Sequence, residues 1–141
     1  MRPIYETPQD RENEASVRDR ICELYNCKCR RSVELSSVDG MLVDKDDNGV
    51  AIIEIKTRRN AHDKYPTYML SANKWRSGMK IAEHYRLPFL LFVKFTDGIY
   101  YTKLKKHYET ARGGRTDRLD PYDQEECIYI DMSNFRRMEY E

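Results

Sequence analysis

Residues 37–58 limit the fold of this 141-residue chain more than any other stretch. A run ending in Gly-Met-Leu-Val is followed by an acidic segment that contains Asn48-Gly49, and then by Val-Ala-Ile-Ile-Glu-Ile-Lys. Two β-prone runs joined by Asn-Gly predict a β-hairpin. Side chains alternate between the two faces of a strand, so Glu54 and Lys56 share one face of the second strand.

Whether Asp39 joins that face depends on the register of the hairpin. Facing residues of an antiparallel pair have numbers with a constant sum, and that sum is odd when the loop holds an even number of residues. A four-residue loop at 46–49 places Asp39 opposite Lys56, and a two-residue loop at 48–49 keeps the same parity. Both loops put Asp39 on the face of Glu54 and Lys56. An odd loop without a compensating bulge would put it on the other face and remove the site.

Two carboxylates and an ammonium on one sheet edge suit a hard divalent cation. Mg²⁺ takes oxygen ligands and is usually bound by one or two protein carboxylates together with the phosphate it acts on. Such a cation polarises a phosphoryl oxygen and lowers the pKa of a bound water, while a lysine can orient the attacking water. The set of Asp39, Glu54 and Lys56 therefore predicts phosphodiester hydrolysis.

Asp39, a spacer of fourteen residues and Glu54-Ile55-Lys56 resemble the signature of the PD-(D/E)xK nuclease superfamily, which includes restriction endonucleases, phage exonucleases and Holliday junction resolvases. Val38 stands where the signature has proline, and the resemblance covers residues 10–95. The resemblance implies Mg²⁺ or Mn²⁺ held by Asp39, Glu54 and the Ile55 carbonyl, with Lys56 positioning the attacking water. It also implies a DNA substrate.

A first helix is expected to begin at Asp10. Its apolar stripe consists of Val17, Ile21, Leu24 and Tyr25. Glu14 falls on the same stripe, and a carboxylate directed inward needs a partner or a metal. The superfamily often supplies an acidic residue from its first helix, and Glu14 is the position that matches. The alternative is a partly exposed first-turn glutamate that the helix dipole favours.

Ser71 is a suitable N-cap for a second helix that runs to about Tyr85. Trp75, Met79, Ala82 and Tyr85 are expected to face the sheet, with Gly78 allowing close approach. Lys74 lies beside this stripe. The resemblance implies that a lysine here supports the metal site or a phosphate, whereas the alternative is a surface lysine whose stem covers apolar area.

The remaining strands complete an α/β fold. A strand is expected from Cys27 through Leu35, a doubly covered strand at 88–95, and a return strand at 99–104. The order αβββαβ predicts a restriction-endonuclease-like core, with a central mixed sheet flanked by helices and C-terminal strand additions. We expect one domain: an arm at 1–9, a core at 10–104, a flexible basic loop at 105–126, and a strand with a helical tail at 127–141.

Cations beside the hairpin are candidates for binding nucleic acid. Arg58 and Arg59 follow the second strand of the hairpin, and Arg31 precedes the first. Contacts from such side chains to the phosphate backbone give affinity without sequence choice. Solvated loop charge is the alternative for Arg58 and Arg59. Arg30 and Arg31 point to opposite faces, so at most one of them is expected to meet a phosphate at this edge. Arg112, Arg115 and Arg118 make the predicted loop basic.

Composition excludes several classes of protein. Lys and Arg number 25 against 24 Asp and Glu, so net charge does not indicate a partner. No segment approaches the roughly 20 apolar residues that cross a bilayer, and the N-terminus lacks a signal-peptide core, so we expect no membrane partner and a cytoplasmic protein of a bacterial or phage-infected cell.

The acidic turn matches the first half of an EF-hand, but Ile55 replaces the required glutamate.

The four cysteines, Cys22, Cys27, Cys29 and Cys127, lack zinc-site spacing. Reduced thiols are the expectation, and an iron–sulfur cluster, which some relatives in the superfamily carry, is the alternative.

The predicted function is therefore a metal-dependent deoxyribonuclease with structure-dependent or nonspecific cutting of duplex, branched or terminal DNA. RNA remains open as a substrate, and a homodimer is suggested by analogy with junction resolvases. The alternative is a catalytically inactive nucleic-acid-binding or accessory protein on the same fold. An unrelated α/β fold would follow if the hairpin parity were wrong.

Overall fold

The computed structural model of the chain describes residues 8–112 and 125–139. The predicted arm at 1–9 lies almost wholly outside these residues, as do Arg115 and Arg118 of the predicted basic loop. None of the helices in the described part has the length and apolar composition needed to cross a membrane.

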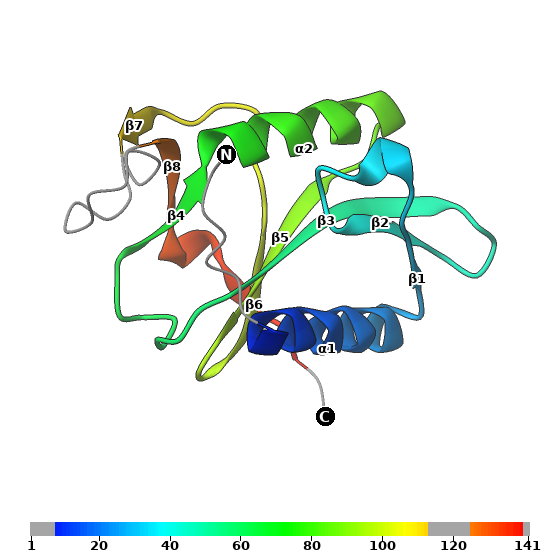
Figure 1. The fold of residues 1–141 in the computed structure, drawn as a ribbon, viewed down its shortest axis with the longest axis horizontal. Coiled ribbons are helices and arrows are strands. Elements are labelled where there is room, and N and C mark those ends of the chain that lie inside the picture. The colour runs from blue at the N-terminus through cyan, green and yellow to red at the C-terminus, as the bar shows by residue number, and fades with distance from the viewer. Residues whose placement is uncertain (1–7, 113–124, 140–141) are drawn as a thin grey trace.

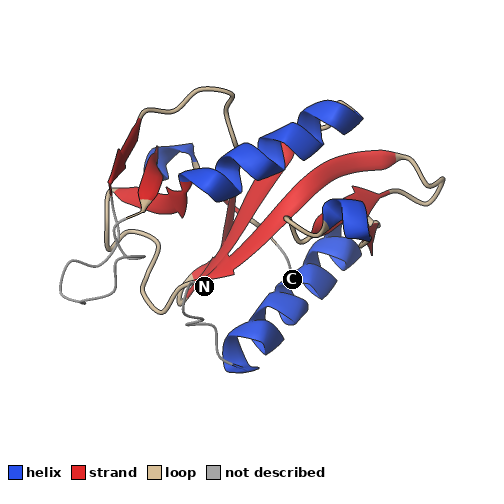
Figure 2. Cartoon of the chain, turned by 45° about the horizontal axis from the view of Figure 1, so that its top comes forward, coloured by secondary structure: helices blue, strands red, loops and turns tan. Residues whose placement is uncertain are grey.

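Two helices lie on opposite faces of a six-stranded sheet (Figures 1 and 2). The helices are α1 (Pro8–Tyr25) and α2 (Ala72–Tyr85). The sheet has the order β1 (Lys28–Arg30), β2 (Gly40–Val43), β3 (Gly49–Thr57), β5 (Phe89–Phe95), β6 (Gly98–Lys103) and β9 (Arg136–Arg137). Strands β3 and β5 are parallel, whereas the other neighbours are antiparallel. The mixed sheet between helices confirms the predicted fold class.

Each face of the sheet has its own apolar core. On one face, Val17 and Ile21 of α1 pack on the odd-numbered residues of β3, such as Ile53. On the other, α2 packs on Phe89 and its neighbours, and a Cβ on Gly78 would lie 2.0 Å from a Phe89 ring carbon. The close approach predicted for this glycine is confirmed, and β5 is buried on both faces as its apolar run indicates.

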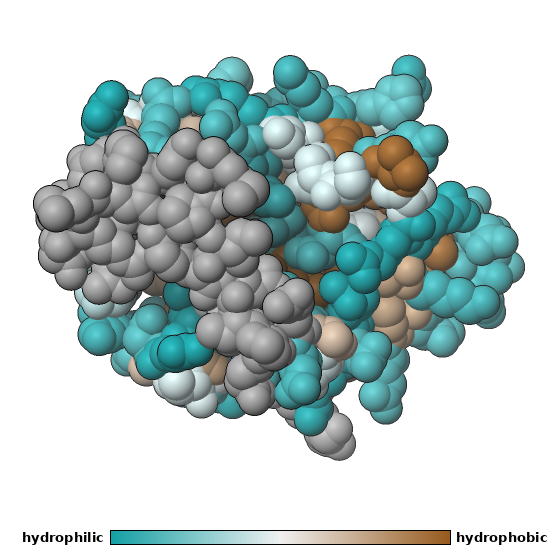
Figure 3. All heavy atoms as spheres, in the orientation of Figure 1, coloured by the Kyte–Doolittle hydropathy of each residue, from teal (hydrophilic) through white to brown (hydrophobic). Residues whose placement is uncertain are grey.

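Three residues assigned to apolar stripes are more exposed than predicted. Leu24 and Tyr25 at the end of α1, and Tyr85 at the end of α2, are exposed to 41%, 43% and 39%. The surface seen in Figure 3 is mostly hydrophilic. Its apolar side chains gather near the 3-10 helix at Val33–Leu35, where Val33 is 87% exposed.

A second sheet of three strands was not predicted. It has the order β4 (Thr67–Ser71), β8 (Glu126–Asp131) and β7 (Thr110–Arg112), and it lies beside the N-terminal end of α2 (Figure 1). No strand was predicted directly before the Ser71 cap, and β7 falls within the predicted loop at 105–126. Strand β8 matches the predicted strand at 127–131.

Two further predictions were wrong. The strand expected through Leu35 ends at Arg30, and a 3-10 turn follows. The expected helical tail is a 3-10 turn at Met132–Asn134 and then β9, which pairs with β6. The Asp131 carboxylate accepts a hydrogen bond from the Ser133 N–H, and the Met138 N–H donates to the Ile99 carbonyl. The Met138 side chain is also buried in the apolar core beneath α1, so both kinds of contact hold the tail along the sheet edge.

Candidate active site

A β-bulge sets the register of the β2–β3 hairpin. Val43 pairs with Gly49, so the loop has five residues, 44–48, which is an odd number. Leu42 then pairs with Ala51, and the unpaired Val50 is the extra residue of the bulge. Both predicted loop lengths were wrong. The bulge nevertheless restores the parity on which the position of Asp39 depends.

Asp39 directly precedes β2, and the register of the hairpin brings it to the level of Glu54, rather than opposite Lys56 as predicted. Gly40 pairs with Ile53, and the Asp39 N–H donates to the Ile53 carbonyl at 3.0 Å. Asp39 lies one residue beyond this last pair, and its charge contributes to the raised pKa of Glu54, so the two carboxylates lie close together. Two carboxylates consequently meet at the start of β2.

The backbone of Ile55 is directed toward Asp39. Its N–H donates to Asp39 Oδ2 at 2.6 Å. The N–H groups of Ile52 and Arg58 donate toward β5, so odd-numbered backbone groups of β3 face β2. Because the N–H and C=O of one strand residue point to the same edge, the Ile55 carbonyl is directed to the edge that carries the Asp39 carboxylate.

Glu54 is the buried centre of the site, with only 3% of its surface exposed. Its Oε2 lies 3.5 Å from Lys56 Nζ and 3.6 Å from Lys74 Nζ. Lys74 also donates to the Ser37 carbonyl at 2.7 Å. The start of α2 places Lys74 here, because the Ser71 hydroxyl caps the helix by accepting the Lys74 N–H, as predicted.

The pKa of Glu54 is raised to about 7. Burial is the main cause and the nearby Asp39 charge adds to it, while Lys56 and Lys74 act in the opposite direction. A carboxyl group in this state changes protonation near neutral pH. A cation beside it would favour the ionised form.

Unsatisfied buried atoms concentrate around this pair of carboxylates. Within residues 8–112 and 125–139, the buried side-chain atoms without a hydrogen-bond partner are Glu54 Oε1, Arg18 Nε and the Tyr68 hydroxyl. Native proteins satisfy nearly all such groups, and an exception calls for an explanation such as an ion. The Asp39 carboxylate, Glu54 Oε1 and the Ile55 carbonyl form an oxygen donor set, so these residues fit Mg²⁺ or Mn²⁺.

Arg18 and Tyr68 were not among the predicted site residues. Arg18 Nη2 lies 3.8 Å from Asp39 Oδ1. Arg18 is four residues after Glu14 and thus on the same side of α1, so the helical spacing that selected Glu14 could have selected it. Tyr68 reads as an ordinary apolar position of β4, and no sequence signal marks it.

The other predicted residues lie around this centre. Glu14 is half-buried on α1, and its charge contributes to the raised pKa of Tyr68. The Arg58 guanidinium carbon lies 4.8 Å from the centroid of the Tyr68 ring. Arg59 and Arg31 are exposed, and Arg31 carbon atoms lie near Gly40 at the start of β2.

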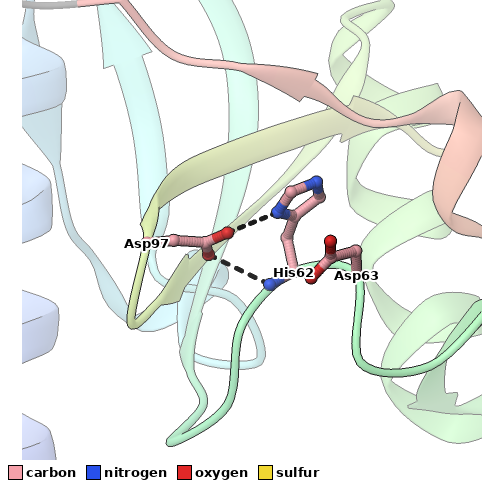
Figure 4. Close-up of side chains that lie close together, drawn as sticks. All are labelled: His62, Asp63 and Asp97. Carbon is pink, nitrogen blue, oxygen red and sulfur yellow. Dashed lines mark hydrogen bonds and ion pairs between the residues drawn. The ribbon is translucent and has the colours of Figure 1, made fainter.

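A second acidic group was not predicted (Figure 4). His62 and Asp63 come from the loop after β3, and Asp97 comes from the β5–β6 turn, with potential ligand atoms within 4.8 Å of one another. His62 Nδ1 lies 2.5 Å from Asp97 Oδ2, its backbone N–H donates to Asp97 Oδ1, and its ring stacks on Tyr100. Both Asp97 oxygens thus already have partners.

The cysteines do not form a comparable group. Cys22, Cys27 and Cys29 lie at the junction of α1 and β1, where burial raises the pKa of each thiol, while Cys127 lies in the second sheet. Among the described residues, no cluster of three or more potential metal ligands contains a cysteine.

The model of the family described as "Phage putative PDDEXK endonuclease" matches residues 1–138. Searches of curated proteins and of solved structures returned no match.

Proposed function

The chain belongs to the phage PDDEXK endonuclease family, and on that premise we propose that it hydrolyses DNA phosphodiester bonds with Mg²⁺ or Mn²⁺. The carboxylate of Glu54 carries the proposal. One of its oxygens is contacted by two lysines, while the other is buried and has no hydrogen-bond partner among the described residues. A buried acceptor left in this way is costly for folding, and a bound cation would satisfy it.

Asp39, Glu54 and the Ile55 carbonyl would hold the cation. When bound, it would polarise the phosphoryl oxygen and lower the pKa of a water. The Ile55 N–H fixes the orientation of the Asp39 carboxylate. Arg18 supplies positive charge beside Asp39 from the opposite face of the sheet.

The two lysines have different roles in this proposal. Lys74 donates a hydrogen bond to the Ser37 carbonyl, which fixes the position of its ammonium group. In that position the ammonium group stabilises the Glu54 carboxylate. Lys56 contacts Glu54, and 32% of its side chain is exposed. Lys56 can therefore reach the substrate and orient the attacking water. Glu14 would orient a water from the side of α1.

Nucleic-acid contacts would extend from both ends of the site. Arg58 follows the end of β3, two residues after Lys56, and Arg59 comes next. Arg31 lies on the other side, near the start of β2. Phosphate contacts of this kind position a strand without reading its sequence, which supports structure-dependent or nonspecific cutting. Action as a homodimer in the cytoplasm of a bacterial or phage-infected cell completes the proposal.

The test is cleavage of linear duplex, single-stranded DNA, nicked circles, four-way junctions and RNA in Mg²⁺, Mn²⁺ or EDTA. We expect metal-dependent cleavage of DNA that Lys56→Ala and Asp39→Ala abolish. Lys80→Ala is the matched control, because Lys80 is exposed on α2. Folded protein that binds DNA but cuts no substrate in either metal would favour the accessory-protein alternative, and preferential cleavage of RNA would replace the proposed substrate.

A further inference from the structure

Tyr68 has a buried hydroxyl that forms no hydrogen bond with any group in residues 8–112 and 125–139. The side chain belongs to β4 and only 4% of the residue surface is exposed. Its ring packs edge-on against Phe95 and at a tilt against Phe135. These contacts account for the ring, but a phenylalanine would make them equally well. The hydroxyl is a polar group that the packing does not explain.

The hydroxyl lies among the charges of the candidate site. Glu54 and Lys56 share one face of β3, Arg58 follows the last residue of that strand, and the Arg58 guanidinium lies over the Tyr68 ring. The pKa of Tyr68 is raised to about 12, mainly by burial; Arg58 lowers it, while the Glu54 and Glu14 carboxylates add to the rise. Tyr68 belongs to the second sheet, but it contacts Arg58 and therefore lies next to the site residues that β3 provides.

An unsatisfied donor and an unsatisfied acceptor occur in the same region. The Tyr68 hydroxyl can donate, Glu54 Oε1 can only accept when ionised, and no hydrogen bond joins them. A water molecule between two such groups would satisfy both. Cations of the Mg²⁺ type retain waters when they bind to proteins.

We propose that Tyr68 is a positioning residue of the site, whose hydroxyl holds a water of the cation's hydration shell next to Glu54. This inference rests on the proposed function. It also explains why one tyrosine of the second sheet keeps a hydroxyl that costs stability in the metal-free protein. In this account β4 completes the site, which residues 37–58 form only in part.

The test compares Tyr68→Phe with Tyr108→Phe. Both changes remove one hydroxyl, but the Tyr108 hydroxyl accepts a hydrogen bond from the Lys105 N–H at 3.1 Å. Mn²⁺ binding is measured by titration calorimetry without nucleic acid, and the urea midpoint is measured in EDTA. Tyr68→Phe should weaken Mn²⁺ binding by about tenfold, as is typical when a group that supports a metal site is removed. Its urea midpoint should be unchanged or higher.

Tyr108→Phe should bind Mn²⁺ like the wild type and have a lower urea midpoint, because it loses a satisfied hydrogen bond. Equal Mn²⁺ affinities of Tyr68→Phe and the wild type would overturn the inference. If Asp39→Ala still abolished binding and cleavage in that case, the proposed function would stand. Absence of Mn²⁺ binding by the wild type would overturn both.

Discussion

The Asp39–Glu54 site and the His62–Asp97 group each bring carboxylates together at the same sheet, but their surroundings differ. Glu54 is buried, faces a second carboxylate and has an oxygen without a partner among the described residues. Asp97 is exposed, and both of its oxygens accept hydrogen bonds from His62. The comparison indicates that a cation is expected where a buried carboxylate oxygen lacks a hydrogen-bond partner, and that a cluster of acidic side chains alone is a weaker sign.

The largest expected difference between the two regions is in catalysis. Lys56→Ala should lower the rate of DNA cleavage by about 10²–10⁴-fold, the usual contribution of a group that positions or activates a water. His62→Ala should leave the rate within about threefold of the wild type, because His62 is engaged with Asp97 and Tyr100. Initial rates on duplex DNA in Mg²⁺ measure both. A greater loss in His62→Ala than in Lys56→Ala would reverse the assignment of the two regions.

The metal-free stability of the two regions should depend on pH with opposite sign. The pKa of Glu54 in the folded state is about 7, above its ordinary value of 4.5, so the folded protein holds this proton more tightly than the unfolded chain does. Stability from this group is present below pH 4.5 and is lost as pH rises through 7, by about 3 kcal/mol. Glu54→Gln should lack this loss.

Urea unfolding of the wild type and Glu54→Gln at pH 4.5 and pH 8, both in EDTA, measures the effect. Relative to the wild type, Glu54→Gln should be more stable at pH 8 than at pH 4.5. If the two proteins differed in stability by the same amount at both pH values, the Glu54 carboxyl would not titrate in this range. That result would contradict the raised pKa that burial and the Asp39 charge cause.

Removing one carboxylate charge should weaken Mn²⁺ binding at least about tenfold more in the Asp39–Glu54 site than in the His62–Asp97 group, since metal affinity depends on the number of charged ligands. Asp39→Asn removes the charge of one proposed ligand, and Asp97→Asn makes the same chemical change in the second group. Titration calorimetry with Mn²⁺ should give weakened binding for Asp39→Asn and wild-type binding for Asp97→Asn. Loss of the main binding event in Asp97→Asn would place the cation at His62.

The smallest expected effect concerns Asp97. Burial alone would raise the pKa of Asp97, but hydrogen bonds from the His62 ring and backbone N–H hold it below the ordinary value of 3.8. Its stabilising contribution is therefore present above pH 3.8 and is lost as pH falls below that value. Asp97→Asn should lower the urea midpoint slightly at pH 7 and by less at pH 3. A larger loss at pH 3 would contradict this.

The sequence predicted correctly those features that depend on one residue and its near neighbours along the chain. Ser71 caps α2 and Gly78 admits Phe89, because a cap and a close approach follow from one residue and its surroundings. The parity of the hairpin was also correct, but its register was not. The bulge at Val50 occurs within an ordinary β-prone run, Val-Ala-Ile-Ile, and nothing in that run distinguishes a bulged residue from a paired one.

Long-range pairing explains the parts that the sequence did not predict. The role proposed for Tyr68 depends on the position of β4, which pairs with β8 near the other end of the chain. A five-residue strand after a polar loop gives little periodicity by itself. Helical spacing places Arg18 on the side of α1 that carries Glu14, but its contact with Asp39 depends on how α1 packs on the sheet.

The most direct test of the central claim is metal removal and return. The wild type and Asp39→Asn are stripped with EDTA, and cleavage of duplex DNA is then measured before and after addition of Mg²⁺ or Mn²⁺. We predict no cleavage by either stripped protein, restored cleavage in the wild type, and none in Asp39→Asn. Cleavage by the stripped wild type, or equal recovery in Asp39→Asn, would contradict a metal-dependent site at Asp39 and Glu54.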